Sequence, residues 1–227
     1  MYNKYNNDDD LITNTSARIP VCLCLDTSGS MYGEPIQELE NGIRLFYDAI
    51  KAETQSKNSC EICIVTFDSN VKVVQNYATV ENCNYNIQLD ADGGTDMYEG
   101  VKKALQLLDN RKQEYKKNGV DYYQPWLIVM SDGQPFNEEG VKQLQIDIKK
   151  READRKLVVF PIGIGSGADM TLMAGFSRKG AIKLKGLNFK EFFEFLSKSM
   201  SIVSSSNPNN NGLLKLDMSN FNGWGEI

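Results

Sequence analysis

A short apolar segment near the N-terminus, residues 21–25, runs directly into a polar turn at residues 26–30. This pattern predicts a buried strand that opens onto a ligand site, because ligands of open parallel sheets bind beyond the carboxyl ends of the strands. Asp26, Ser28 and Ser30 alternate along the turn, so in an extended conformation their oxygens can face one point. Serine, glycine and aspartate are also ordinary turn formers, so the turn alone leaves a purely structural interpretation open.

Two later junctions between predicted elements also carry oxygen side chains. Thr95 follows a Gly-Gly pair and begins a helical pattern, and Asp132 lies two residues after the end of the apolar run 126–130. Glycines at 93 and 94 allow the loop to approach an ion closely, although Thr95 is also a good helix N-cap. A cluster made only of oxygen ligands suits a hard cation, magnesium or manganese, better than zinc.

Together these segments resemble the von Willebrand factor A domain with its metal-ion-dependent adhesion site. The family pattern is Asp-x-Ser-x-Ser, then a Thr, then an Asp after a later strand, and the motifs are most similar to those of intracellular bacterial proteins associated with tellurium resistance. The resemblance spans residues 18–204. It implies a site for Mg²⁺, with Mn²⁺ or Ca²⁺ as alternatives, whose open position takes a Glu or Asp of a partner protein. The implied metal ligands are Asp26, Ser28, Ser30, Thr95 and Asp132.

Strand and helix patterns alternate along the chain, which predicts an α/β, doubly wound, mostly parallel sheet with helices on both faces. The strand patterns 61–67 and 71–77 are separated by three residues, too few for a parallel crossover, so one antiparallel edge strand is expected. The resemblance implies six strands. We expect a flexible N-terminal arm at 1–17, one domain at 18–206, and a linker and C-terminal tail at 207–227 that packs on a surface of its own or of a partner.

Composition excludes several functions. The 25 basic and 30 acidic residues give a net charge of −5, and the basic residues lie beside acidic ones on helical patterns, so no nucleic-acid role is expected. The absence of histidine removes every Ser-His or Cys-His pair. Four of the five cysteines fall in strand patterns, which indicates buried thiols in a reducing compartment. Residues 60 and 63 would point to opposite faces of a strand, so they cannot share a metal.

Residues 163–168 fit the relaxed dinucleotide pattern G-x-G-x-x-G/A. That pattern requires an acidic residue at the end of the next strand, where this chain has Lys183 and Lys185, so no dinucleotide is expected. The first ten residues are polar and acidic, and no apolar run approaches the length of a membrane span. A cytoplasmic protein with no membrane contact is the corresponding expectation.

Two classes of function remain. The first is a metal-dependent protein-interaction module, and the second is a metal-dependent phosphoryl transferase or hydrolase on the same sheet. Phosphatases of the haloacid type need a second Asp two residues after the first, and Ser28 occupies that position. The chain also has no Walker pattern and no histidine base. The sequence therefore favours a binding module over an enzyme.

Overall fold

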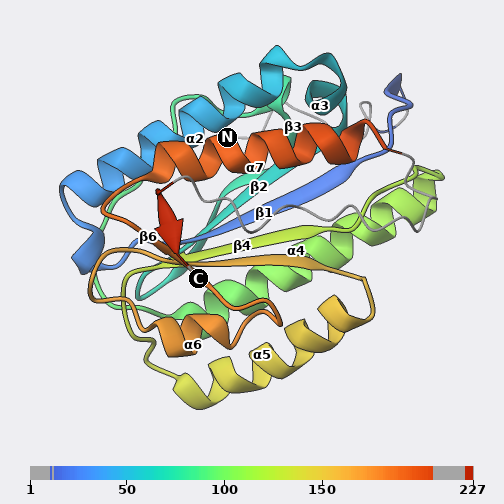
Figure 1. The fold of residues 1–227 in the computed structure, drawn as a ribbon. Coiled ribbons are helices and arrows are strands. Elements are labelled where there is room, and N and C mark those ends of the chain that lie inside the picture. Colours follow the sequence, from blue (N-terminus) through green and yellow to red (C-terminus); the bar gives the residue numbers. More distant parts are fainter. Residues whose placement is uncertain (1–10, 12, 207–222, 227) are drawn as a thin grey trace.

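The computed structural model describes residues 11, 13–206 and 223–226, which form a seven-stranded sheet covered by helices on both faces (Figure 1). The strand order is β3-β2-β1-β4-β5-β6-β7. All neighbouring strands are parallel except the two edge pairs, β2 with β3 and β6 with β7. The strands are β1 (Ile19–Asp26), β2 (Cys60–Phe67), β3 (Val71–Thr79), β4 (Trp126–Ser131), β5 (Val158–Gly163), β6 (Ile182–Leu184) and β7 (Gly225–Glu226).

Two groups of helices cover the sheet. In Figure 1, α2, α3 and α7 lie over one face, and α4, α5 and α6 lie over the other. Short 3-10 turns, η1 (Gly29–Met31) and η2 (Val80–Asn82), follow β1 and β3. The helices are α2 (Glu34–Ala52), α3 (Thr54–Ser59), α4 (Met97–Asn118), α5 (Glu138–Ala153), α6 (Met170–Ala174) and α7 (Phe189–Ser204). The α/β fold with a mostly parallel sheet is confirmed.

β1 is a central strand, and all eight of its residues are buried. Ile19, Val21, Leu23 and Leu25 belong to the apolar cluster under α2 and α7, while the intervening cysteines belong to the cluster under α4 and α5. This two-sided burial explains why the strand is apolar from Ile19 to Leu25 instead of alternating. The two cysteines of the CxxC sequence, at 60 and 63, also lie in opposite clusters, as predicted, and all five cysteines are buried free thiols.

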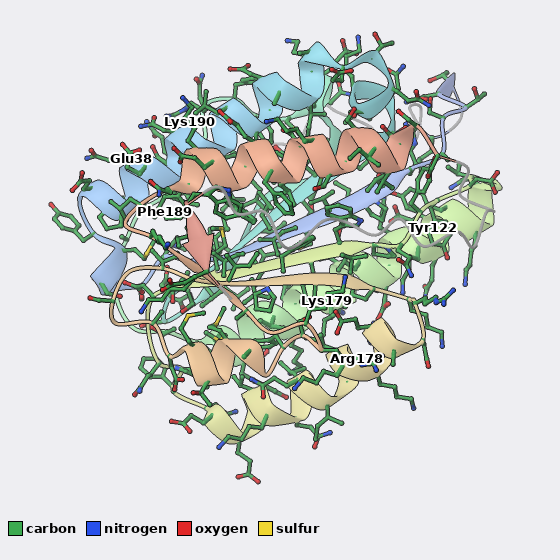
Figure 2. All side chains as sticks on the ribbon, in the orientation of Figure 1. Glu38, Tyr122, Arg178, Lys179, Phe189 and Lys190 are labelled. Atoms are coloured by element: carbon green, nitrogen blue, oxygen red, sulfur yellow. The ribbon has the colours of Figure 1, made fainter. Side chains whose placement is uncertain are left out.

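α2 and α7 pack closely against each other. Figure 2 shows Glu38 of α2 near Phe189 and Lys190 of α7, where the two helices run side by side. Gly42 of α2 permits this approach, because a Cβ at that position would lie 3.0 Å from the Cβ of Phe189. Pro35 is in the first turn of α2, where its missing N–H costs no hydrogen bond.

The expectation of six strands with one antiparallel edge requires correction, because the structure has seven strands with an antiparallel strand at each edge. The additional strand, β7, contains only Gly225 and Glu226 and pairs with β6. A two-residue strand carries no alternating pattern, and glycine and glutamate have low strand propensity, so the sequence offers no signal for it.

The described end of the C-terminal tail packs on the domain itself. Trp224 is buried, its ring centroid lies 6.0 Å from that of Phe192 and 5.7 Å from that of Phe195, and its carbonyl accepts a hydrogen bond from the N–H of Lys185 at 3.0 Å. Three further apolar residues of the tail, which are also expected to pack on a surface, lie outside the described residues: Leu214, Leu216 and Phe221.

Part of the expected N-terminal arm also contacts the domain. Among its described residues, Leu11 is buried and the Asn14 amide donates to the carbonyl of Asn58 at 2.9 Å, while residues 1–10 and 12 lie outside the description. In the part of the chain that the structure describes, no helix combines the length and apolar character needed to cross a membrane.

Candidate metal centre

The end of β1 gathers the first three candidate ligands. Asp26 is the last residue of the strand, and its carboxylate is buried. The N–H of Ser28 donates to Asp26 Oδ1 at 2.9 Å, which closes the tight turn that follows the strand. The hydroxyl oxygens of Ser28 and Ser30 lie 3.1 Å apart. One short turn therefore presents a carboxylate and two hydroxyls together.

The end of β4 brings Asp132 to the same place. The parallel register of β1 and β4 sets Asp26 beside Ser131, whose hydroxyl donates to Asp26 Oδ2 at 2.5 Å. Ser30 Oγ donates to Asp132 Oδ1 at 2.8 Å across 102 positions of sequence. The two carboxylates are thus linked through the N–H and hydroxyl of Ser28 and the hydroxyl of Ser30. Four of the five candidate ligands form one cluster: Asp26, Ser28, Ser30 and Asp132.

Thr95, the fifth candidate, is buried in a loop that packs on both of these turns. The carbonyl of Gly93, whose φ is +72°, accepts a hydrogen bond from the N–H of Gly29 at 3.0 Å. A Cβ on Gly133 would lie 3.5 Å from Thr95 Oγ1, so the Thr95 hydroxyl faces the residue that follows Asp132. The structure therefore places Thr95 beside the cluster. The helix cap of α4 is Asp96, whose carboxylate accepts from the N–H of Glu99 at 3.2 Å, so the alternative role of Thr95 as that cap is not observed.

The end of β2 contributes a further acidic residue that the sequence prediction missed. Thr27 Oγ1 lies 3.5 Å from Asp68 Oδ2, and the backbone carbonyl of Asp68 accepts from the N–H of Asp96 at 2.8 Å. The N–H of Asp92 donates to the carbonyl of Thr27 at 3.0 Å. Three further acidic residues, Asp68, Asp92 and Asp96, thus lie in the loops that pack around the Asp26 turn, and Lys72 forms an ion pair with Asp68 at 3.6 Å.

Burial raises the pKa of Asp26 to about 6, because the charged form loses its hydration. Hydrogen bonds from Ser131 and Ser28 oppose this shift, and the negative charge of Asp132 adds to it. A buried carboxylate with a raised pKa gains stability in its charged form when a cation binds beside it. Asp26 is therefore the group at this edge whose charge a bound metal would compensate most directly.

The donor set fits a hard divalent ion but not a soft one. Within the described residues there is no group of three or more His, Cys, Asp or Glu side chains that could hold a metal, and this cluster has only two carboxylates. Its remaining donors are hydroxyl oxygens. Two carboxylates with several neutral oxygens match the chemistry of Mg²⁺, whereas zinc sites prefer nitrogen and sulfur.

Ser131 is the cluster residue that sequence reasoning did not identify. It donates to Asp26 and accepts from the N–H of Gly133 at 3.3 Å, so it ties the two turns together. Its position directly before Asp132, at the end of a predicted strand, was a usable signal. Assigning its partner, however, required the register between β1 and β4.

Comparisons with known proteins identify the fold family. Over 154 residues the chain is 26% identical to an uncharacterized protein of Synechocystis, covering 65% of this chain and 33% of that protein. It is 22% identical over 188 residues to inter-alpha-trypsin inhibitor heavy chain H6 of Homo sapiens, covering 74% of this chain and 14% of the relative. The chain thus spans a third or less of the length of these relatives.

A solved structure with the same fold is the vWF domain of the type V pili tip protein Mfa5 from Porphyromonas gingivalis. It superimposes with a TM-score of 0.62 at 11% identity, and the match covers 85% of this chain and 98% of that one. The family model of the von Willebrand factor type A domain matches residues 21–204. Because this match spans most of the sequence, the chain belongs to the von Willebrand factor type A domain family.

Proposed function

We propose that this chain is a metal-dependent docking module in which a divalent ion at the end of β1 binds a carboxylate of a partner protein. Domains of this family are protein-interaction or adhesion modules, which supports the docking part. The observation that carries the metal part is the hydrogen-bonded chain that links Asp26 to Asp132 through Ser28 and Ser30. The residues that would hold the ion are Asp26, Ser28, Ser30, Thr95 and Asp132.

Charge and ligand number explain how such an ion would serve docking. Asp26 and Asp132 are the two anionic members of the set, so their charge just balances that of Mg²⁺. Five protein oxygens leave one position of the six that Mg²⁺ prefers, and a Glu or Asp of the partner would fill it. When bound, the ion supplies a positive centre for that carboxylate. Mn²⁺ and Ca²⁺ remain alternatives, since both also take oxygen ligands.

The chain's own residues prepare the site. Ser131 and the N–H of Ser28 hold the two oxygens of Asp26 in place, and η1 fixes Ser30 toward Asp132. A site held by hydrogen bonds before binding loses less conformational entropy when the ligand arrives. This preorganisation supports a binding role, and the neutral Ser28 at the position of a phosphatase general acid supports binding over phosphoryl transfer or hydrolysis.

The five buried free thiols support a reducing compartment, which is consistent with a cytoplasmic location. A role in a tellurium-resistance or stress-response system rests on the resemblance of the motifs alone.

The decisive test captures partners from the cells that make the protein, with Mg²⁺ or with a chelator. Thr95→Ala removes a neutral oxygen without changing net charge, so it should abolish capture while the fold is retained. Thr79→Ala is the matched control, because Thr79 is similarly buried, at 6% exposed against 7% for Thr95, and pairs with Glu61 at the start of β2, the strand end that faces away from the candidate site. Capture that survives both the chelator and Thr95→Ala would contradict the proposal, as would metal-dependent phosphate-ester hydrolysis that Asp26→Asn removes.

A further inference from the structure

Two aromatic side chains near the candidate metal centre are unusually exposed. Among the large hydrophobic residues in the described part of the chain, Tyr32 is 79% exposed and Phe136 is 70% exposed, more than any other. Exposed aromatic groups of this size are common anchors in protein interfaces, because a partner can bury a large rigid surface at small entropic cost. Their location therefore indicates where a partner would gain most from contact.

Both side chains belong to loops that carry candidate ligands. Tyr32 follows Ser30 by two residues, and its N–H donates to the carbonyl of Gly29 at 3.2 Å, which ends η1. Phe136 follows Asp132 by four residues, and its N–H donates to the carbonyl of Thr95 at 3.2 Å. The backbone at each aromatic residue is thus fixed by a hydrogen bond to the loop that also presents a ligand.

The ring of Phe136 lies directly on the Gly93-Gly94 loop. A Cβ built on Gly94 would overlap this ring, so only glycine at position 94 leaves room for it. The ring therefore covers the backbone next to Thr95 while most of its surface faces solvent. A partner that reaches Thr95 and Asp132 must pass beside this ring.

The charges around the cluster restrict the partner further. Asp92 is exposed and Asp96 is partly exposed, and both lie in the loop that packs on the Asp26 turn. A bound divalent ion would balance only Asp26 and Asp132, so Asp92 and Asp96 would leave this rim negative. A partner segment with several acidic residues would be repelled, whereas one acidic residue with basic or apolar neighbours would be accepted.

We propose that Tyr32 and Phe136 form an aromatic rim that contacts a large apolar side chain beside the partner's metal-binding acid. The recognised segment would then contain a single Glu or Asp next to a residue such as Leu, Ile, Met or Phe, with basic and not acidic residues further along. This inference rests on the proposed metal-dependent docking and specifies the partner's chemistry. The rim excludes water from the contact, which strengthens the attraction between ion and carboxylate.

The test selects a random peptide library on the full chain in Mg²⁺ and elutes bound peptides with a chelator. We expect enrichment of a single acid next to a large apolar residue. Tyr32→Ser and Phe136→Ser should each weaken a selected peptide by about tenfold, the scale of an interface anchor, while leaving the calorimetric affinity for Mg²⁺ itself unchanged. Ile146→Ser is the matched control, because Ile146 is 63% exposed on α5 and should have no effect.

The outcomes of this test distinguish a failure of the aromatic rim from a failure of metal-dependent docking. Selected peptides whose binding depends on Mg²⁺ but is equal in the wild type and in both rim variants would overturn the aromatic rim and leave metal-dependent docking intact. Enrichment of acid-rich peptides would overturn the charge argument in the same way. Recovery of no chelator-sensitive peptide would contradict metal-dependent docking, and the rim would fall with it.

Discussion

Glu61, at the start of β2, and Asp26, at the end of β1, are both fully buried carboxylates at opposite ends of two neighbouring parallel strands. Glu61 lies among cations: Arg111 donates to its two oxygens at 2.7 and 2.9 Å, and Arg18 Nε lies 3.5 Å from Oε1. The hydroxyl of Tyr115 donates to Glu61 at 2.5 Å. Tyr122, whose ring lies 5.3 Å from that of Tyr115, is labelled in Figure 2 and marks this end of the strands.

Asp26 is held by hydroxyl and amide donors instead. Within the described residues, neither Asp26 nor Asp132 forms an ion pair with a lysine or arginine. The fold therefore supplies arginines to Glu61 at one end of the strands. At the other end it leaves Asp26 and Asp132 without a basic partner. A carboxylate buried for structural reasons is normally paired, so the unpaired acids are the ones to associate with an external cation.

The largest effect is expected from removing Glu61, the carboxylate that is paired with arginines. Glu61→Ala leaves Arg111 and Arg18 buried without their carboxylate, which should lower the free energy of unfolding by about 3–5 kcal/mol. Urea unfolding measures this loss, which should be the same in Mg²⁺ and in chelator. Glu114→Gln is the control, because Glu114 contacts the same arginine at 2.6 Å but is 49% exposed, and it should cost less than about 1 kcal/mol. Equal losses for the two variants would contradict the comparison.

The next effect concerns Asp26 and Asp132, the carboxylates without a basic partner. An ion that binds only the native state adds roughly 2.7 kcal/mol to the free energy of unfolding at a hundredfold excess over its dissociation constant. We expect Mg²⁺ to give the wild type this increment and Asp26→Asn to lose it. Asp109→Asn should keep the Mg²⁺-dependent increment, since Asp109 of α4 pairs with Lys112 of the same helix and with Arg151 of α5, away from the candidate site. Identical unfolding of the wild type in Mg²⁺ and in chelator would refute this prediction.

A pH series in chelator isolates the charge of Asp26. Its pKa in the folded chain is raised to about 6, so the native state holds this proton more tightly than the unfolded state does. The stability that the protonated group contributes is present below its ordinary pKa near 3.8 and is lost as the pH rises through about 6. The wild type should therefore lose stability relative to Asp26→Asn across this range, by on the order of 3 kcal/mol. A difference between the two proteins that does not vary with pH would argue against a buried, unpaired carboxylate.

The smallest effect is expected at Ser131, the cluster residue that was not predicted from the sequence. Ser131→Ala removes the hydroxyl that donates to Asp26, and a hydrogen bond to a charged group contributes about 1.5 kcal/mol or more. We expect a loss of this size in urea unfolding at neutral pH, together with weaker Mg²⁺ binding, because Asp26 is then held less firmly. Ser69→Ala is the control. The Ser69 hydroxyl accepts from the N–H of Gly94 at 2.9 Å, so its removal should leave the contact between Ser131 and Asp26 unchanged. Mg²⁺ affinity that is unaltered in Ser131→Ala would show that Ser131 does not position the carboxylate.

Much of the fold could be predicted because its long elements have strong patterns. β1 and β4 are apolar up to their last residue, and α2 and α7 carry apolar residues at helical spacing, so their existence and their order follow from the sequence pattern. The short elements α3, α6 and β7 could not be found in this way. α3 has the sequence TQSKNS without one apolar residue, and β7 depends on pairing with a distant strand.

The candidate site divides along the same line. Polar residues at strand ends are visible in the sequence, and the structure brings Asp26, Ser30 and Asp132 into one hydrogen-bonded cluster. The partners of Ser131 and Asp68 depend on strand register and loop packing, which no local pattern encodes. The buried Glu61–Arg111 pair was missed for the same reason, since its members are 50 residues apart and meet only through the packing of α4 on β2.

A calorimetric titration of Mg²⁺ into the metal-free wild-type chain, Asp26→Asn and Asp109→Asn tests the metal centre directly. We expect one saturable binding event in the wild type and in Asp109→Asn, and none in Asp26→Asn. Binding that is equal in all three proteins, or absent from the wild type at millimolar Mg²⁺, would contradict a metal centre at the end of β1.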